Sequence, residues 1–257
     1  MPPSPTHTAT APVDGVLFDV DDTLVDTRRA FALAIEAVAR VWLPHLTEDR
    51  HPEALARWRG DPNGHFRSYT RGEVDFDTQR RRRADDLQAT FGGASLDDPA
   101  YAEWLELFWG TFRASFEPHP DARPAIDRLR AAGLRIGALT NAATAIQDDK
   151  LAQTGFADVP VLVGVDTLGF GKPDPRAFEE ACRRLGTHPT RTAYVGDELE
   201  VDAIGAVGAG LVGVWLDRPG NRHDGLSTVH ADEARAGGVR VIDTLADLPT
   251  VLGVAPA

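Results

Sequence analysis

Four aspartates crowd into the nine residues Phe18–Asp26, FDVDDTLVD, directly after the apolar run Gly15–Phe18. Carboxylates this close repel one another, so the cluster requires a cation, strong hydrogen-bond donors, or both. Asp19 and Asp21 are two residues apart and share one face if the chain is extended. The pattern predicts an oxygen-rich site for a charged ligand at the end of a buried strand.

Further polar groups follow later apolar runs. Thr140 ends the run 134–140 and Asn141 follows it. Lys172 follows the run 159–165, and Asp197 follows the run 192–196, with Asp202 shortly after. Ligands of open α/β sheets bind where the carboxyl ends of the strands meet, so we expect these residues at one edge.

These side chains together suit the binding and transfer of a phosphoryl group. Asp19, Asp21 and Asp197 offer the oxygen ligands that Mg²⁺ prefers, and no His or Cys cluster suggests zinc instead. Lys172 adds a positive charge and Thr140 a donor, which together suit a phosphoryl group and the charge that builds during its transfer.

Six β-rich runs must position these groups: 15–20, 134–140, 159–165, 192–196, 211–215 and 239–242. The runs are continuous rather than alternating, as expected for parallel strands covered on both faces. Helical patterns lie near 122–133, 173–186, 201–210 and 244–252, so the predicted fold class is α/β, with a doubly wound, Rossmann-like parallel sheet.

More than a hundred residues separate the first run from the second, and they hold no convincing strand. Phe31, Ile35, Val38 and Trp42 fall at helical spacing, and further helical stretches lie near 52–58, 73–90 and 99–113. We therefore predict an inserted helical domain, because a plain crossover of that length is uncommon. The chain is expected to consist of a loose tail over 1–13, a core over 14–27 and 116–257, and a helical domain over 28–115.

The ordered motifs resemble those of the haloacid dehalogenase-like hydrolases, which are mostly phosphatases. The resemblance rests on Asp19-Val20-Asp21-Asp22-Thr23, then Thr140, then Lys172, then Gly196-Asp197 with Asp202. It spans the whole core, whereas the insert resembles the family's helical cap in length and helicity only. Asp22 departs from the glycine that is common there in the family.

The resemblance implies a role for each matched residue. Asp19 is the expected nucleophile, forming an aspartyl-phosphate, and Asp21 the acid and base. Asp19, the backbone carbonyl of Asp21 and Asp197 are the expected Mg²⁺ ligands. Thr140 binds the phosphoryl group, Lys172 screens Asp19, and Asp202 orients the lysine or a metal-bound water. Asn141 is a second expected phosphate ligand, with a plain turn residue as the alternative.

The run Arg80–Arg83 stands out in an acidic chain. Arg80 and Arg83 fall on or beside the apolar stripe of their predicted helix, where one of them would meet the substrate's leaving group. Local ion pairs with neighbouring aspartates are the favoured alternative, since arginines beside acids on a helix usually pair there.

The overall composition limits which classes of binding partner are expected. A net charge of -12 argues against nucleic acid or an anionic membrane, and no stretch approaches a membrane span. One cysteine excludes an internal disulfide framework, which fits a reducing cytoplasm. We expect a monomer or homodimer that acts on a small phosphorylated metabolite.

Two alternatives to a Mg²⁺-dependent phosphatase stay open from the sequence. A phosphomutase uses the same core residues and differs in how the cap excludes water. A non-catalytic phosphate-binding protein on this fold would have lost Asp19, Asp21, Lys172 or Asp197, and none is lost.

Overall fold

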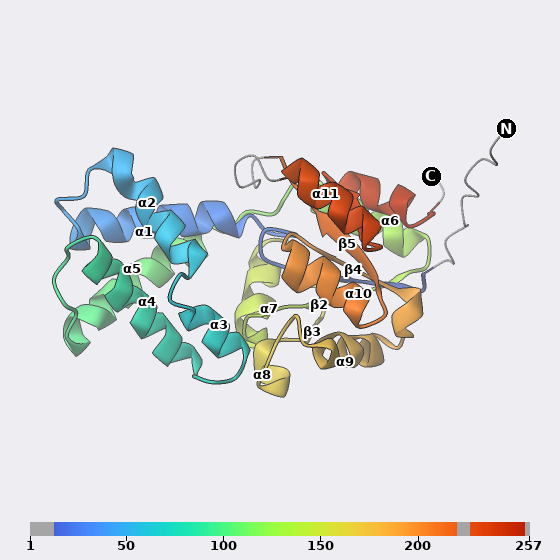
Figure 1. Ribbon diagram of the computed structural model, residues 1–257, viewed down its shortest axis with the longest axis horizontal. Helices are drawn as coiled ribbons and strands as arrows, with labels where there is room; N and C mark the ends of the chain where they lie inside the picture. The colour runs from blue at the N-terminus through green and yellow to red at the C-terminus, as the bar shows by residue number, and fades with distance from the viewer. Residues whose placement is uncertain (1–12, 220–226, 255–257) are drawn as a thin grey trace.

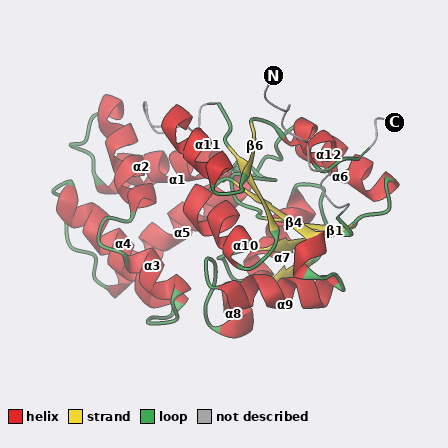
Figure 2. Cartoon of the chain, turned by 45° about the vertical axis from the view of Figure 1, so that its right-hand side comes forward, coloured by secondary structure: helices red, strands yellow, loops and turns green. Residues whose placement is uncertain are grey.

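A computed structural model describes residues 13–219 and 227–254, without the side chains of 227–230. Six strands form one sheet with the order β3-β2-β1-β4-β5-β6, in which every adjacent pair is parallel. Figure 2 shows the strands in yellow with helices around them. The strands are β1 (Gly15–Phe18), β2 (Arg135–Leu139), β3 (Val161–Val163), β4 (Thr192–Gly196), β5 (Val212–Leu216) and β6 (Arg240–Ile242). The predicted fold class is confirmed, and each strand lies within one residue of a predicted run.

Helices cover both faces of the sheet, which explains why its strands are predominantly apolar. Val16 and Phe18 of β1 pack on one face, while Leu17 between them packs on the other. The helices of this part are α6 (Ala122–Ala131), α7 (Thr144–Gln153), α8 (Val165–Leu168), α9 (Pro175–Leu185), α10 (Gly205–Gly208), α11 (Ser227–Ala236) and α12 (Leu248–Val251). Short turns η2 (Pro189–Arg191) and η4 (Leu245–Asp247) and the π-helix η3 (Leu199–Ile204) complete it.

The strand order changes direction at β1. The chain builds outward from β1 through β2 to β3, then returns to place β4 on the other side of β1. Connections after β1 and β4 therefore leave in opposite directions and open a crevice between them. Asp19 follows β1 and Asp197 follows β4, so both acidic motifs reach this crevice.

Residues 27–114, here called the insert, contain helices and no strand. The helices are α1 (Thr27–Trp42), α2 (His51–Gly60), α3 (His65–Thr70), α4 (Phe76–Thr90) and α5 (Asp98–Ala114), with a short turn η1 (Glu48–Arg50). They lie to one side of the sheet in Figure 1. Aspartates at positions 26, 75 and 97 begin α1, α4 and α5 by accepting hydrogen bonds from backbone N–H groups of the first turn.

The insert has a hydrophobic core of its own. Trp104 is fully buried and stacks on Phe108 with ring centroids 5.3 Å apart, and Trp58 packs on both rings. The insert also touches loops of the sheet. The Gly171 N–H donates to the Thr70 carbonyl at 2.9 Å, which joins the end of α3 to the loop before Lys172.

The two connections to the insert pair with each other. Val25 and Pro118 form an antiparallel bridge, flanked by hydrogen bonds from Asp26 N–H to the Glu117 carbonyl and from His119 N–H to the Leu24 carbonyl. The chain therefore enters and leaves the insert at one narrow place, directly beyond the acidic motif.

The tail predicted over residues 1–13 lies outside the described residues except for Val13. That residue is 9% exposed and packs in the hydrophobic core, so the prediction was wrong there. No helix among the described residues is long and apolar enough to cross a membrane.

Candidate active site

The ends of β1, β2 and β4 place Asp19, Thr140 and Asp197 at one edge of the sheet. The Asp19 N–H donates to the Val195 carbonyl of β4 at 2.8 Å, and the Thr140 N–H donates to the Val163 carbonyl of β3 at 3.0 Å. Both residues thus continue the parallel hydrogen-bonding ladder for one step beyond their strands. The two residues are 7% and 1% exposed, and the sheet holds their backbones in place.

Lys172 links two of the aspartates. Its ammonium is buried and donates to Asp19 Oδ1 and Asp202 Oδ1, each at 2.7 Å, and to the Tyr194 hydroxyl at 2.6 Å. The Tyr194 hydroxyl in turn donates to the Leu139 carbonyl at 3.0 Å. The three donors of the ammonium are therefore satisfied, and the lysine is fixed against Asp19.

Two glycines permit this close packing. A Cβ on Gly196 would lie 2.2 Å from Asp202 Oδ2, and a Cβ on Gly171 would lie 2.2 Å from Asn141 Oδ1. Any larger residue at position 196 would push Asp202 away from Lys172. This close contact with Asp202 explains why the residue before Asp197 is a glycine.

The carboxylates outnumber the cations. Burial, Asp202 and Asp21 raise the pKa of Asp19, although Lys172 acts in the opposite direction. Loss of solvation, then Asp22, Asp202 and Asp19, raise the pKa of Asp197 well above its usual range. Burial alone would lower the pKa of Lys172, but its two carboxylate partners raise it. The site holds more negative charge than Lys172 neutralises.

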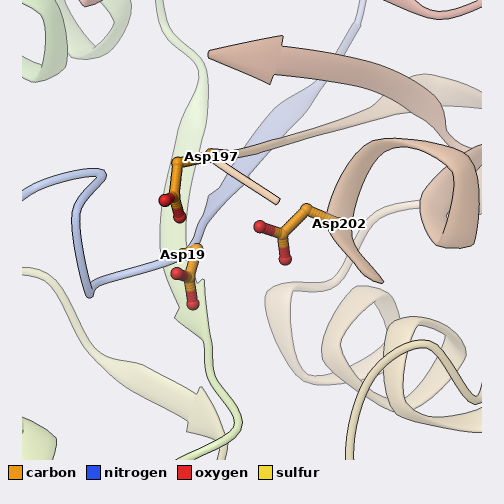
Figure 3. A group of neighbouring side chains, drawn as sticks. All are labelled: Asp19, Asp197 and Asp202. Atoms are coloured by element: carbon orange, nitrogen blue, oxygen red, sulfur yellow. The ribbon is translucent and has the colours of Figure 1, made fainter. Parts of the chain in front are cut away.

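A divalent cation fits this excess charge. Asp19, Asp197 and Asp202 each offer a carboxylate oxygen, and these atoms lie within 4.8 Å of one another. Figure 3 shows the three side chains converging from the ends of β1 and β4 and from η3. Hard oxygen ligands with net negative charge are those that Mg²⁺ takes. The Asp202 carboxylate is also an ion-pair partner of Lys172, as Asp19 is.

The Asp21 side chain lies outside that group and turns to α7. Gln147 Nε2 donates to Asp21 Oδ2 at 2.6 Å and lies 3.1 Å from Thr140 Oγ1, while Lys150 Nζ pairs with Asp21 Oδ1. Sequence reasoning missed Gln147, Lys150 and Tyr194. A signal for Lys150 was available, because the chain has only two lysines among 27 basic residues. Both lysines pair with motif aspartates.

Asn141 holds the lysine loop. Its side-chain Nδ2 donates to the Lys172 carbonyl at 2.9 Å, and its Oδ1 accepts from the Lys172 N–H at 2.7 Å. Both ends of the amide are thus engaged with one backbone unit. The structure gives Asn141 the task of positioning Lys172, where the sequence suggested a phosphate ligand.

The two arginines considered as substrate contacts, Arg80 and Arg83, pack inside the insert. Arg80 is 8% exposed, and its guanidinium lies over the rings of both Phe76 and Trp109, at 4.1 and 3.7 Å from their centroids. Arg83 stacks on Trp58 and donates to its carbonyl at 2.6 Å. Both guanidiniums thus pack on aromatic rings. The sequence suggested a substrate contact or local ion pairs, and not this arrangement.

A different arginine of the insert reaches the motif loop. Arg59 of α2 pairs with Asp22 Oδ2 at 2.8 Å, while Asp22 Oδ1 accepts from Thr27 Oγ1 and the Arg28 N–H. Asp22 has φ +55°, a conformation that glycine adopts freely and aspartate tolerates. The residue that departs from the family pattern is therefore the anchor of the insert.

Comparison with known proteins decides the family. Residues 13–210 match the family model of the haloacid dehalogenase-like hydrolases. The chain belongs to this family. The hydrolase is 31% identical over 211 residues to a glyceraldehyde 3-phosphate phosphatase of Methanopyrus kandleri, a match that covers 80% of this chain and 84% of that protein.

Two further relatives show the range of the family. A phosphoserine phosphatase of Thermus thermophilus is 37% identical over 190 residues, covering 74% of the hydrolase and 67% of that protein. Among solved structures, the defluorinating L-2-haloacid dehalogenase Rha0230 superimposes with a TM-score of 0.72 at 26% identity, covering 94% and 95% of the two chains. The resemblance seen in the motifs is confirmed at the level of the family.

Proposed function

We propose that this hydrolase is a Mg²⁺-dependent phosphatase that cleaves a small phosphate monoester through an aspartyl-phosphate. The observation that carries the proposal is the placement of two aspartates two residues apart, each paired with a different buried lysine. Asp19 lies beside the other acidic ligands, and Asp21 shares the Gln147 amide with Thr140. A nucleophile and a separate acid–base group are what a two-step phosphoryl transfer requires.

The first half-reaction transfers the phosphoryl group to the enzyme. A carboxylate oxygen of Asp19 bonds to phosphorus while the bond between phosphorus and the ester oxygen breaks. Asp21 gives a proton to the departing oxygen, so the product leaves as an alcohol. Lys172 keeps Asp19 in place and offsets charge on the transferred oxygens, and the Thr140 hydroxyl binds one of them.

The second half-reaction releases phosphate. Water attacks phosphorus, its proton passes to Asp21, and the bond between phosphorus and Asp19 breaks. Asp19, Asp197 and the backbone carbonyl of Asp21 would hold Mg²⁺, with Asp202 beside them. When bound, the ion neutralises phosphoryl charge. The presence of Asp21 favours this hydrolysis over dehalogenation, which does not need a second aspartate to protonate the leaving group.

The substrate class follows from the size of the relatives' substrates and from the charge of the protein. The named phosphatase relatives act on small phosphorylated metabolites, and a net charge of -12 disfavours nucleic acid and anionic membranes. We place the enzyme in the cytoplasm, which fits its single, buried cysteine.

Phosphate release from a panel of small phosphate monoesters, with Mg²⁺ and with EDTA, tests the proposal. We expect metal-dependent release that Asp19→Asn lowers by at least ~10³-fold, because the nucleophile is lost. The matched control is Asp148→Asn, the same exchange at an exposed position of α7. Conversion of a sugar phosphate with little free phosphate would identify a mutase. Binding without turnover would identify a non-catalytic protein, and either result refutes the proposal.

A further inference from the structure

Lys150 is one of the most deeply buried charged side chains in the described part of the hydrolase. It is 2% exposed and lies on the inner face of α7, where Asp21 is its ion-pair partner. A lysine is almost never this buried without a partner, because an unpaired ammonium loses its hydration. The position of Lys150 therefore depends on Asp21, and the position of Asp21 depends on Lys150.

Aromatic rings enclose the same ammonium. Lys150 Nζ lies 5.6 Å from the ring centroid of Phe112, at the end of α5, and 5.1 Å from that of Phe116. Phe116 belongs to the connection that returns from the insert to the sheet, and the two rings pack edge to face. These rings keep water from the ammonium, which strengthens its attraction for the carboxylate.

The two donors on α7 fix the plane of the Asp21 carboxylate. Lys150 occupies one oxygen and Gln147 the other, and Gln147 also reaches Thr140. A carboxylate has about four acceptor sites, so two remain for a substrate oxygen or a water. The Asp21 side chain keeps 36% exposure, which leaves that free side accessible.

We propose that Lys150 is a positioning residue for acid–base catalysis: it holds the Asp21 carboxylate, with Gln147, in the orientation that delivers a proton to the leaving oxygen. This inference rests on the proposed phosphatase function and assigns it a second lysine. Lys172 serves the nucleophile, and Lys150 serves the acid and base. Lys150 does not itself touch the reacting atoms.

The need for a proton donor depends on the leaving group, and this separates positioning from general stability. An alkyl phosphate requires protonation as its oxygen departs, whereas the p-nitrophenolate of p-nitrophenyl phosphate leaves as a stable anion. The ratio kcat/KM reports formation of the aspartyl-phosphate for both esters. We expect Lys150→Met to lower kcat/KM about 10- to 100-fold for the best alkyl ester and less than about threefold for the aryl ester.

A second comparison tests whether the effect passes through Asp21. In an Asp21→Asn background, Lys150→Met should lower kcat/KM for the alkyl ester by less than about twofold, because the group it orients is already lost. Asp148→Asn, two residues away on the exposed face of α7, is the matched control and should leave both esters unaffected. Lys150→Gln, which keeps a donor without the charge, replaces the methionine variant should that variant not fold.

The outcomes distinguish this inference from the function on which it rests. Equal losses for both esters, or an undiminished loss in the Asp21→Asn background, would show that Lys150 only supports the fold and overturn the positioning role. Phosphate release from neither ester by the folded wild-type enzyme would overturn the phosphatase function, and the role of Lys150 with it.

Discussion

Replacing Arg59 by glutamine removes the guanidinium that joins the insert to the motif loop. Its partner Asp22 has a side chain that is 7% exposed, while the Arg59 side chain keeps 24% exposure. Burial on its own raises the pKa of Asp22, but Arg59 and nearby donors outweigh it and lower that pKa, so the carboxyl is ionised. Without Arg59, the Asp22 Oδ2 oxygen loses its partner.

The cost follows from the geometry of the pair. Breaking a fully buried ion pair costs ~3–5 kcal/mol, and an exposed pair contributes ~0–1 kcal/mol. Asp22 keeps its hydrogen bonds from Thr27 and the Arg28 N–H on the other oxygen, and water can reach the Arg59 side. We therefore expect Arg59→Gln to lower the free energy of unfolding by about 2 kcal/mol.

Urea unfolding followed by tryptophan fluorescence measures this loss. Four of the five tryptophans lie in the insert, so their fluorescence reports mainly on that part. The matched control is Arg50→Gln, because Arg50 pairs with Glu53 at the same 2.8 Å but with both side chains about half exposed. We expect that control to leave the urea midpoint essentially unchanged, because an exposed pair contributes little.

A double-mutant cycle with Asp22→Asn completes the test. Asparagine tolerates the positive φ at this position and retains an oxygen for Thr27, so it removes the charge with little other change. The coupling energy between the two substitutions should be about 1–2 kcal/mol. A cost of Arg59→Gln equal to that of Arg50→Gln, or additive effects in the cycle, would refute the view that this pair anchors the insert.

Three further predictions concern the rest of the hydrolase. Burial tends to raise the pKa of Asp121, but Arg218 and other donors lower it to about 2. Asp121 therefore contributes about 2 kcal/mol to the free energy of unfolding above pH ~4, and this contribution is lost as the pH falls toward 2. Asp121→Asn should make the free energy of unfolding depend less on pH in this range. Trp104→Ala should cost ~3–5 kcal/mol in urea unfolding, because Trp104 is fully buried against Phe108. Mg²⁺ at about 100 times its dissociation constant should stabilise the protein by ~2.7 kcal/mol, seen as a raised melting temperature; a shift that persists in Asp197→Asn would place the metal elsewhere.

The sheet was predictable because its strands are buried on both faces. Short, predominantly apolar runs such as those of β1, β4 and β5 are typical of parallel strands covered on both faces, and the polar residues after them could be placed at one edge. Asp19, Lys172 and Asp202 come together as that reasoning expects. The sequence did not predict which hydrogen-bond or ion-pair partner each side chain has. That depends on how loops far apart in the sequence pack together.

Helix α7 was not predicted, for a physical reason. Three of its side chains are buried, and two of these are Gln147 and Lys150. Periodicity arguments treat polar residues as solvent-facing, so a helix whose buried face is polar has no recognisable stripe. The arginines of α4 were difficult to interpret for the same reason. The Arg80 guanidinium packs on two aromatic rings inside the insert, where an apolar side chain would be expected. Sequence patterns failed where buried polar groups serve the site or the insert's core.

The scarcity of lysine has a consequence for spectroscopy. The protein's two ε-amines are those of Lys150 and Lys172, and every other basic side chain apart from histidine is a guanidinium. Labelling lysine with ¹⁵N would therefore give two side-chain NMR resonances, one beside Asp21 and one beside Asp19. Asp19 and Asp21 would then each have an isotopic reporter beside it in the unmodified protein.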